Sequence, residues 1–174
     1  SINWMRRAES SESRSAGMTL RLFHKCLSTK PAHPGAAATF ATLLLMPSTD
    51  PDIALLRHTV ATLAYRAAKV LRDVPPEFRS RSFGADTRSP VLILTHMADL
   101  IAWAVRFAHG APVWKAEGTG DWDRESQRFF DSLAALDREL AAGAPFGNAL
   151  DKLIQGPLAD ALTHVGQLAL LRGM

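Results

Sequence analysis

Apolar residues follow helical spacing through most of the chain. From Asp52 onward they recur at alternating intervals of three and four, which places them on one face of a helix, and no segment gives a convincing strand pattern. Four such patterns follow one another. Because each amphipathic helix must bury its apolar face against a neighbour, we expect an all-α protein built as a four-helix bundle.

Local start and stop signals bound the first two predicted helices. Pro75 and Pro76 end the first, and residues 77–88 predict a long, polar, Arg-rich loop. The second begins at Ser89-Pro90, a hydroxyl N-cap followed by Pro, and runs to about Ala108 before Gly110. The apolar stripe of the first helix comprises Ile53, Leu56, Val60, Leu63, Ala67, Val70 and Val74.

Similar signals bound the last two predicted helices. The third begins near Asp121, carries Asp123 and Glu125 in its first turn, and ends at Gly143 and Pro145. The fourth starts near Asn148 and is interrupted at Gly156-Pro157, where a kink or a fresh start is expected. Their apolar stripes are Phe129, Leu133, Leu136 and Leu140 in the third, and Leu158, Ala161, Leu162, Val165, Leu168 and Leu171 in the fourth.

Composition narrows the class of protein. With 174 residues and 47% hydrophobic content, the chain is one domain, or one domain with a tail. The single Cys26 excludes a disulfide framework and a Cys-rich zinc fold, so a metal would be held by His and carboxylates. Since no uninterrupted apolar run reaches the roughly 18 residues of a membrane span, we expect a soluble, cytoplasmic protein without a membrane partner.

Charge separates the first 45 residues from the rest. Residues 1–45 carry six basic and two acidic groups, a balance of +4, whereas residues 46–174 carry 14 basic and 15 acidic groups, a balance of −1. The helical part therefore shows no basic face for nucleic acid. We expect residues 1–45 to be a disordered or non-native leader, Met46 to be the original initiator, and residues 46–174 to form the helical domain.

Three side chains carry the candidate chemistry. His96 falls on a face of the second helix, with Leu92, that we expect to point to the core, and Asp160 and His164 are four residues apart in the fourth helix. Separately, they predict a core histidine and a modest ion pair worth a few tenths of a kcal/mol. Together, two imidazoles and one carboxylate suit a divalent metal with open coordination positions; zinc is the first choice, and nickel, manganese or iron are alternatives.

A family resemblance adds to this hypothesis. The segments Leu94-Thr-His-Met-Ala-Asp99-Leu-Ile-Ala-Trp103 and Gly156-Pro-Leu-Ala-Asp160-Ala-Leu-Thr-His164-Val-Gly166-Gln167 resemble the DinB/YfiT-like family of four-helix metalloproteins, over about residues 50–174. The resemblance implies that His96, Asp160 and His164 hold the metal. The commonest family pattern has His where this chain has Asp160. A carboxylate there is similar to the branch that resembles mycothiol-dependent maleylpyruvate isomerase, in which a Glu occupies that position.

The resemblance also implies an activity. Family members that are enzymes are mostly transferases of a low-molecular-weight thiol such as bacillithiol or mycothiol, so it implies attack by a thiolate held at the metal on a small electrophilic substrate, or hydrolysis as a neighbouring reaction. Two alternatives stay open: a non-catalytic binding or structural module that forms a homodimer through an apolar helix face, and an oxygen-using ferrous enzyme suggested by the two-His, one-carboxylate count.

Several other residues are weighed as supports for this site. Asp99 is expected either beside the metal ligands or at the exposed surface. Gln167 is expected either to hydrogen-bond a metal ligand or to cap a helix contact. Gly166 is expected to permit close helix approach. His58 and His109 are expected outside the site. Trp103, Trp114 and Trp122 are candidates for a pocket mouth, and Arg79, Arg81 and Arg88 are candidates for contact with an anionic thiol cofactor.

Overall fold

The computed structural model describes residues 50–111, 113–143 and 150–174. Helices and the segments that connect them make up these residues, and no strand occurs among them. The predicted leader, the boundary at Met46, the stop at Pro145 and the start near Asn148 lie outside the described residues. The helices are α3 (Pro51–Leu71), α4 (Pro76–Arg79), α5 (Pro90–Ala108), α6 (Trp122–Ala141), α7 (Leu150–Leu153), the π-helical segment η2 (Ile154–Leu158) and α8 (Ala159–Gly173).

Helix ends agree with the local chemistry of the sequence. The carboxylate of Asp50 accepts hydrogen bonds from the first backbone N–H groups of α3, and Asp121 accepts one from the N–H of Arg124 in α6. Helix α5 begins and ends as predicted, although the hydroxyl of Ser89 makes no capping bond and its carbonyl accepts from the first turn instead. Gly110 follows α5 with a φ of +71°, a conformation that glycine adopts without steric cost.

Two stretches differ from the sequence-based expectation. Residues 77–88, expected to be entirely a loop, contain the short helix α4, because Phe78 is buried and packs edge-on against Trp122. The expected interruption at Gly156-Pro157 is confirmed, and it takes the form of a π turn. Pro157 has no N–H to give an α-helical hydrogen bond, and the N–H of Ala159 reaches the carbonyl of Ile154, five residues earlier.

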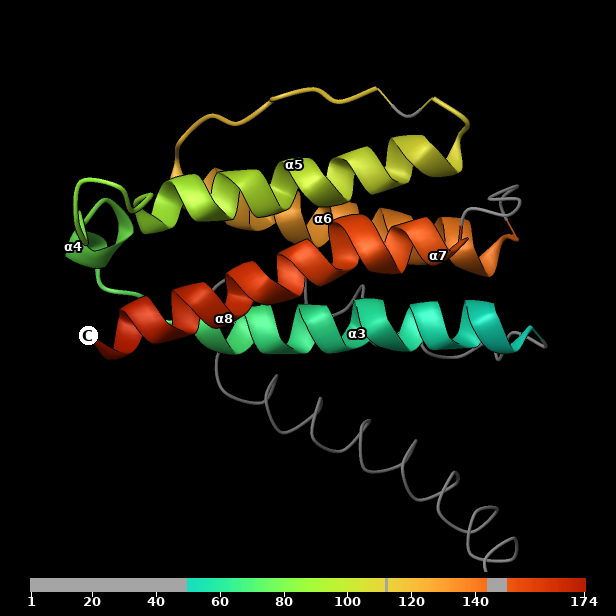
Figure 1. The fold of residues 1–174 in the computed structure, drawn as a ribbon, viewed down its shortest axis with the longest axis horizontal. Coiled ribbons are helices and arrows are strands. Elements are labelled where there is room, and N and C mark those ends of the chain that lie inside the picture. Colours follow the sequence, from blue (N-terminus) through green and yellow to red (C-terminus); the bar gives the residue numbers. More distant parts are fainter. Residues whose placement is uncertain (1–49, 112, 144–149) are drawn as a thin grey trace, which may run out of the picture. The chain divides into compact units, whose positions relative to one another are not determined.

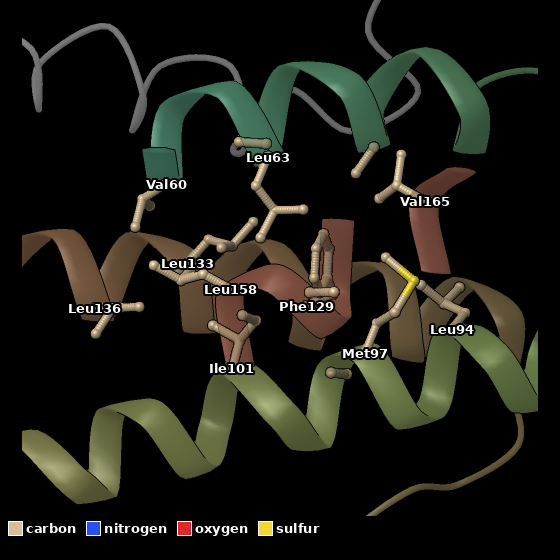
Figure 2. Packing of buried hydrophobic residues seen from close by; sticks show 14 of the residues in the cluster. Val60, Leu63, Leu94, Met97, Ile101, Phe129, Leu133, Leu136, Leu158 and Val165 are labelled. Carbon is tan, nitrogen blue, oxygen red and sulfur yellow. The ribbon is translucent and has the colours of Figure 1, made fainter. Parts of the chain in front are cut away.

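The core lies among four helical stretches. Helix α5 packs against α6 and α8, and α3 packs against the same two helices from the opposite side (Figure 1). Figure 2 shows apolar side chains from all of these helices pointing toward one another, with Phe129 of α6 near the centre. The predicted stripes of the third and fourth helices are buried, apart from the partly buried Leu162. Arg172 ties the last helix to the end of α3 by donating to the carbonyls of Val70 and Arg72, each at 2.8 Å.

Helix α5 is more apolar than the sequence analysis allowed for. Among the described residues it is the one helix long and apolar enough to cross a membrane by length and composition. The sequence analysis counted uninterrupted apolar residues and so did not detect this helix. Asp99 and Arg106 interrupt the apolar run, but the mean hydropathy of the helix remains high enough for a membrane span. Since 56% of its most apolar window is buried inside the protein, packing within the core accounts for this composition.

Candidate metal centre

Helices α5 and α8 bring the three predicted ligands together. His96 lies in the second turn of α5, and Asp160 and His164 lie one above the other on α8, four residues apart. One potential ligand atom from each residue can be chosen so that all three lie within 4.8 Å of one another. The imidazole rings of His96 and His164 meet edge to face, with their centroids 5.0 Å apart. A convergence predicted from two separate sequence segments is therefore present in the fold.

The nitrogen–oxygen contacts within this cluster are longer than most hydrogen bonds. His96 Nε2 lies 3.3 Å from one oxygen of Asp160, and His164 Nε2 lies 3.4 Å from the other. Unstrained N–H···O bonds are shorter, commonly about 2.9–3.0 Å. With zinc-to-ligand bonds of about 2.0–2.1 Å, neighbouring ligand atoms of a tetrahedral site lie about 3.3 Å apart. The two distances run to different oxygens of Asp160, and one ligand atom from each of the three residues lies within 4.8 Å of the others. The donor set is therefore one that a divalent ion binds, at a spacing wider than that of a bound tetrahedral ion.

The cluster is open to solvent on one side. The side chains of His96, Asp160 and His164 are 26%, 45% and 18% exposed. His96 does not point into the core as the sequence analysis expected, and Leu92, placed on the same face, is exposed as well. The buried face of α5 runs instead through Ile93, Met97 and Ile101 (0% exposed each). Because α5 is apolar on several faces, its periodicity could not identify which one packs inward.

A hydrogen bond from Gln167 orients one ligand. His164 Nδ1 lies 2.9 Å from Gln167 Oε1, and an amide oxygen only accepts, so Nδ1 carries the proton. The lone pair of His164 is then on Nε2, the atom that faces Asp160. Metal-binding histidines almost always donate from their second nitrogen in this way. Gln167 therefore binds a candidate ligand, one of the two roles that the sequence analysis left open.

Asp99, one turn from His96, lies in neither of the two expected places. It is 4% exposed and accepts from Arg128 Nη1 at 2.6 Å, and it also accepts from the backbone N–H of Glu117. Arg128 also donates to Glu125, which is fully buried. We call Asp99, Glu125 and Arg128 the Asp99 network. Sequence analysis missed it because Asp99 and Arg128 are 29 residues apart; the spacing of three between Glu125 and Arg128 was the available signal.

Electrostatics within the Asp99 network favour the ionised forms of Glu125 and Arg128. Burial favours the neutral form of Glu125, but hydrogen bonds from Thr119 and Arg128 outweigh it, so the pKa of Glu125 lies below its ordinary value. For Arg128, burial is again the largest single influence and disfavours the charge. Its hydrogen bonds to Glu125 and Asp99 reverse this effect and raise the pKa of Arg128. In the network the single guanidinium of Arg128 is therefore shared by two carboxylates.

A covering loop, residues 113–121, runs back along α5 toward the start of α6 (Figure 1). Trp114 in this loop lies against the metal-site residue His96, with ring centroids 5.9 Å apart. The other two candidate tryptophans lie elsewhere, since Trp103 packs on Phe107 and Trp122 is buried against Phe78. Of the three, Trp114 is therefore the one that contacts a candidate ligand.

The remaining predicted supports fall outside the cluster. Arg79 pairs with Asp123 at 3.1 Å and Arg81 lies over the ring of Phe83, so these two arginines have their own partners. Gly166 is exposed, and a Cβ built there would meet no atom within 4 Å, which contradicts its expected role in close helix approach. Arg88 is exposed. His58 and His109, which the sequence analysis placed outside the site, are also exposed, and His109 pairs with Glu139.

Comparison with known proteins gives no match to a protein-family model, to a curated protein or to a solved structure. The assignment of chemistry to this chain therefore depends on its own residues and their geometry.

Proposed function

We propose that the described helices form a four-helix bundle of the DinB/YfiT-like type, and that His96, Asp160 and His164 bind a divalent metal ion, with zinc as the first choice and nickel, manganese or iron as alternatives. The observation that carries this proposal is the convergence of three ligand atoms within 4.8 Å from two helices. The donor set of two imidazoles and one carboxylate supports it, as does the orientation of His164 by Gln167.

We further propose that the site acts on a small electrophile as a metal-dependent transferase or hydrolase, with a low-molecular-weight thiol as the candidate cosubstrate. A bound divalent ion would acidify a thiol or a water and favour its anion. His96, Asp160 and His164 would leave coordination positions open, and their partial exposure gives a small molecule access. The single carboxylate reduces the charge of the site from +2 to +1, so an anionic donor is still attracted.

The rival proposals predict different metal contents. A non-catalytic module that dimerises would fold and function without metal. A ferrous enzyme would hold iron and depend on oxygen. The convergence of two imidazoles and one carboxylate favours a metal-binding protein over the metal-free module. Three protein ligands favour a catalytic over a structural zinc site, because a structural site usually has four protein ligands and no open position.

Metal analysis of the purified full chain tests this proposal. We expect one equivalent of zinc after equilibration, and loss of that zinc in the double variant His96→Ala, His164→Ala. The matched control is His58→Ala, which removes an exposed imidazole from α3 and should retain the zinc. Helical content measured by circular dichroism should be unchanged in all three proteins. Zinc retained by the double variant, or absent from the folded wild-type protein, would overturn the proposal.

A further inference from the structure

Within the described residues, the covering loop is held in place although it is exposed. Residues 113–120 are all exposed and belong to no helix. The loop is nevertheless fixed by Arg106, whose Nε donates to the carbonyl of Val113 at 3.0 Å, and by Asp99, which accepts from the N–H of Glu117. Thr119 donates to Glu125 through both its N–H and its hydroxyl. Anchors on α5 and α6 therefore position a segment that buries almost nothing of its own.

Gly118 fixes the distance between the loop and α5. A Cβ at Gly118 would lie 2.0 Å from Cγ2 of Thr95, which is possible for no real side chain, so only glycine fits without a shift. The backbone of the loop is thus pressed onto the helix turn that carries Thr95 and His96. This close approach sets how far Trp114 lies from the metal-site residues.

Trp114 keeps an open face beside the candidate metal position. Its side chain contacts the ring of His96, yet the residue is 46% exposed, an unusual state for an indole held at a defined place. The Asp99 network that holds the loop contains two buried carboxylates and the partly buried Arg128. Such buried ion pairs add little net stability, and we attribute this one to conformational specificity. The conformation that it specifies is the placement of this loop.

We propose that Trp114 is a specificity-determining residue that binds the flat apolar part of a small ligand whose anionic donor group occupies the open metal positions. This inference rests on the proposed metal site. The favoured ligand is an aromatic or similarly planar molecule with a thiolate, hydroxamate or carboxylate donor. Contact with the indole would favour such a ligand over an aliphatic one with the same donor by about three- to tenfold.

Two hydroxamates that share a donor group test the proposal on the zinc-loaded full chain. Acetohydroxamate carries a methyl group and benzohydroxamate carries a phenyl group, and the dissociation constant of each is measured by isothermal titration calorimetry. We expect the wild-type protein to bind benzohydroxamate three- to tenfold more tightly. Trp114→Ala should abolish this preference, and Trp114→Phe should retain part of it, while the zinc affinity of both variants stays at the wild-type value.

A matched control variant and the possible negative results distinguish the proposal for Trp114 from the proposal for the metal site. Val113→Ala removes an exposed apolar side chain from the same loop, keeps the carbonyl that Arg106 binds, and should leave the preference intact. A preference that survives in Trp114→Ala, equal affinities in the wild-type protein, or zinc without hydroxamate binding would each overturn this inference and leave the metal site standing. A folded wild-type protein without zinc would overturn both.

Discussion

Two groups of charged side chains lie one turn apart on α5, and they differ in how completely their hydrogen-bonding groups are used. In the Asp99 network, buried carboxylates receive short bonds from Arg128 and from backbone N–H groups. In the cluster of His96, Asp160 and His164, side chains are partly exposed and the nitrogen–oxygen distances are 3.3 and 3.4 Å. The first group has little capacity left for a ligand, whereas the second has lone pairs available to one.

This difference separates a structural role from a binding role better than residue type does. Both groups contain acidic residues and one partner from another helix, and both include a pair spaced by one helical turn. Burial without partners would be very costly, so the Asp99 network must be satisfied within the protein. Exposure lowers that demand, which allows His96, Asp160 and His164 to be joined only by the longer contacts of 3.3 and 3.4 Å.

The largest expected effect comes from breaking the buried group. Arg128→Met leaves Asp99 and Glu125 buried without their cation, so we expect the free energy of unfolding to fall by about 3–5 kcal/mol in urea denaturation. Arg124→Met, which removes an exposed arginine from the same helix, is the control and should change it by less than about 0.5 kcal/mol. Equal effects of Arg128→Met and Arg124→Met would show that the Asp99 network does not stabilise the fold.

A smaller effect is expected from loosening the exposed group. Gln167→Met removes the acceptor that orients His164 and leaves all three metal ligands in place, so zinc affinity should fall by about 10- to 100-fold in competition with a chromophoric chelator. The free energy of unfolding without metal should change little. Gln155→Met, at an exposed glutamine of η2, should bind zinc as the wild-type protein does. Unchanged affinity in Gln167→Met would mean that His164 needs no such orientation.

The smallest effect is a pH dependence of the Asp99 network. The folded-state pKa of Glu125 is lowered, so its carboxylate contributes stability that is fully present above its ordinary value of 4.5 and is lost as pH falls through the folded-state pKa. We expect Glu125→Gln to be less stable than the wild-type protein at neutral pH, and its stability to decline less between pH 4.5 and more acid conditions. Equal slopes for the two proteins in urea denaturation across that range would contradict the assignment.

Local chemistry made several parts of the fold predictable from the sequence. Helix α6 starts where Asp121 caps it, and α5 starts at Pro90 as predicted, although the hydroxyl of Ser89 makes no capping bond. Helix α4 was missed, because a single apolar residue, Phe78, gives no periodicity and its partner Trp122 is distant in sequence. The stripe of α3 was largely correct, since polar residues separate its apolar positions clearly.

The candidate site was predictable only in part. A spacing of four placed Asp160 and His164 on one face of a helix, and that pairing depends on helix geometry alone. Asp99 is buried and His96 is partly exposed because of the way α5 packs against its neighbouring helices. The sequence does not show which face of α5 packs inward, because α5 is apolar on several faces. The contact between Trp114 and His96 depends on a loop whose course is set by Gly118 and by charges on two helices, which no local pattern encodes.

The π turn at η2 has a consequence for how α8 can change. A π turn accommodates one more residue than the α turn that it replaces, and one residue corresponds to about 100° of rotation around an α-helix. Leu153 precedes η2, and Asp160 lies two residues after it. The widened turn between them therefore changes the direction in which Asp160 projects around the helix axis. Deleting a single residue here would rotate Asp160 and His164 away from His96 while leaving a continuous helix. The convergence of the three candidate ligands therefore depends on the phase of a helix as well as on the identity of its side chains.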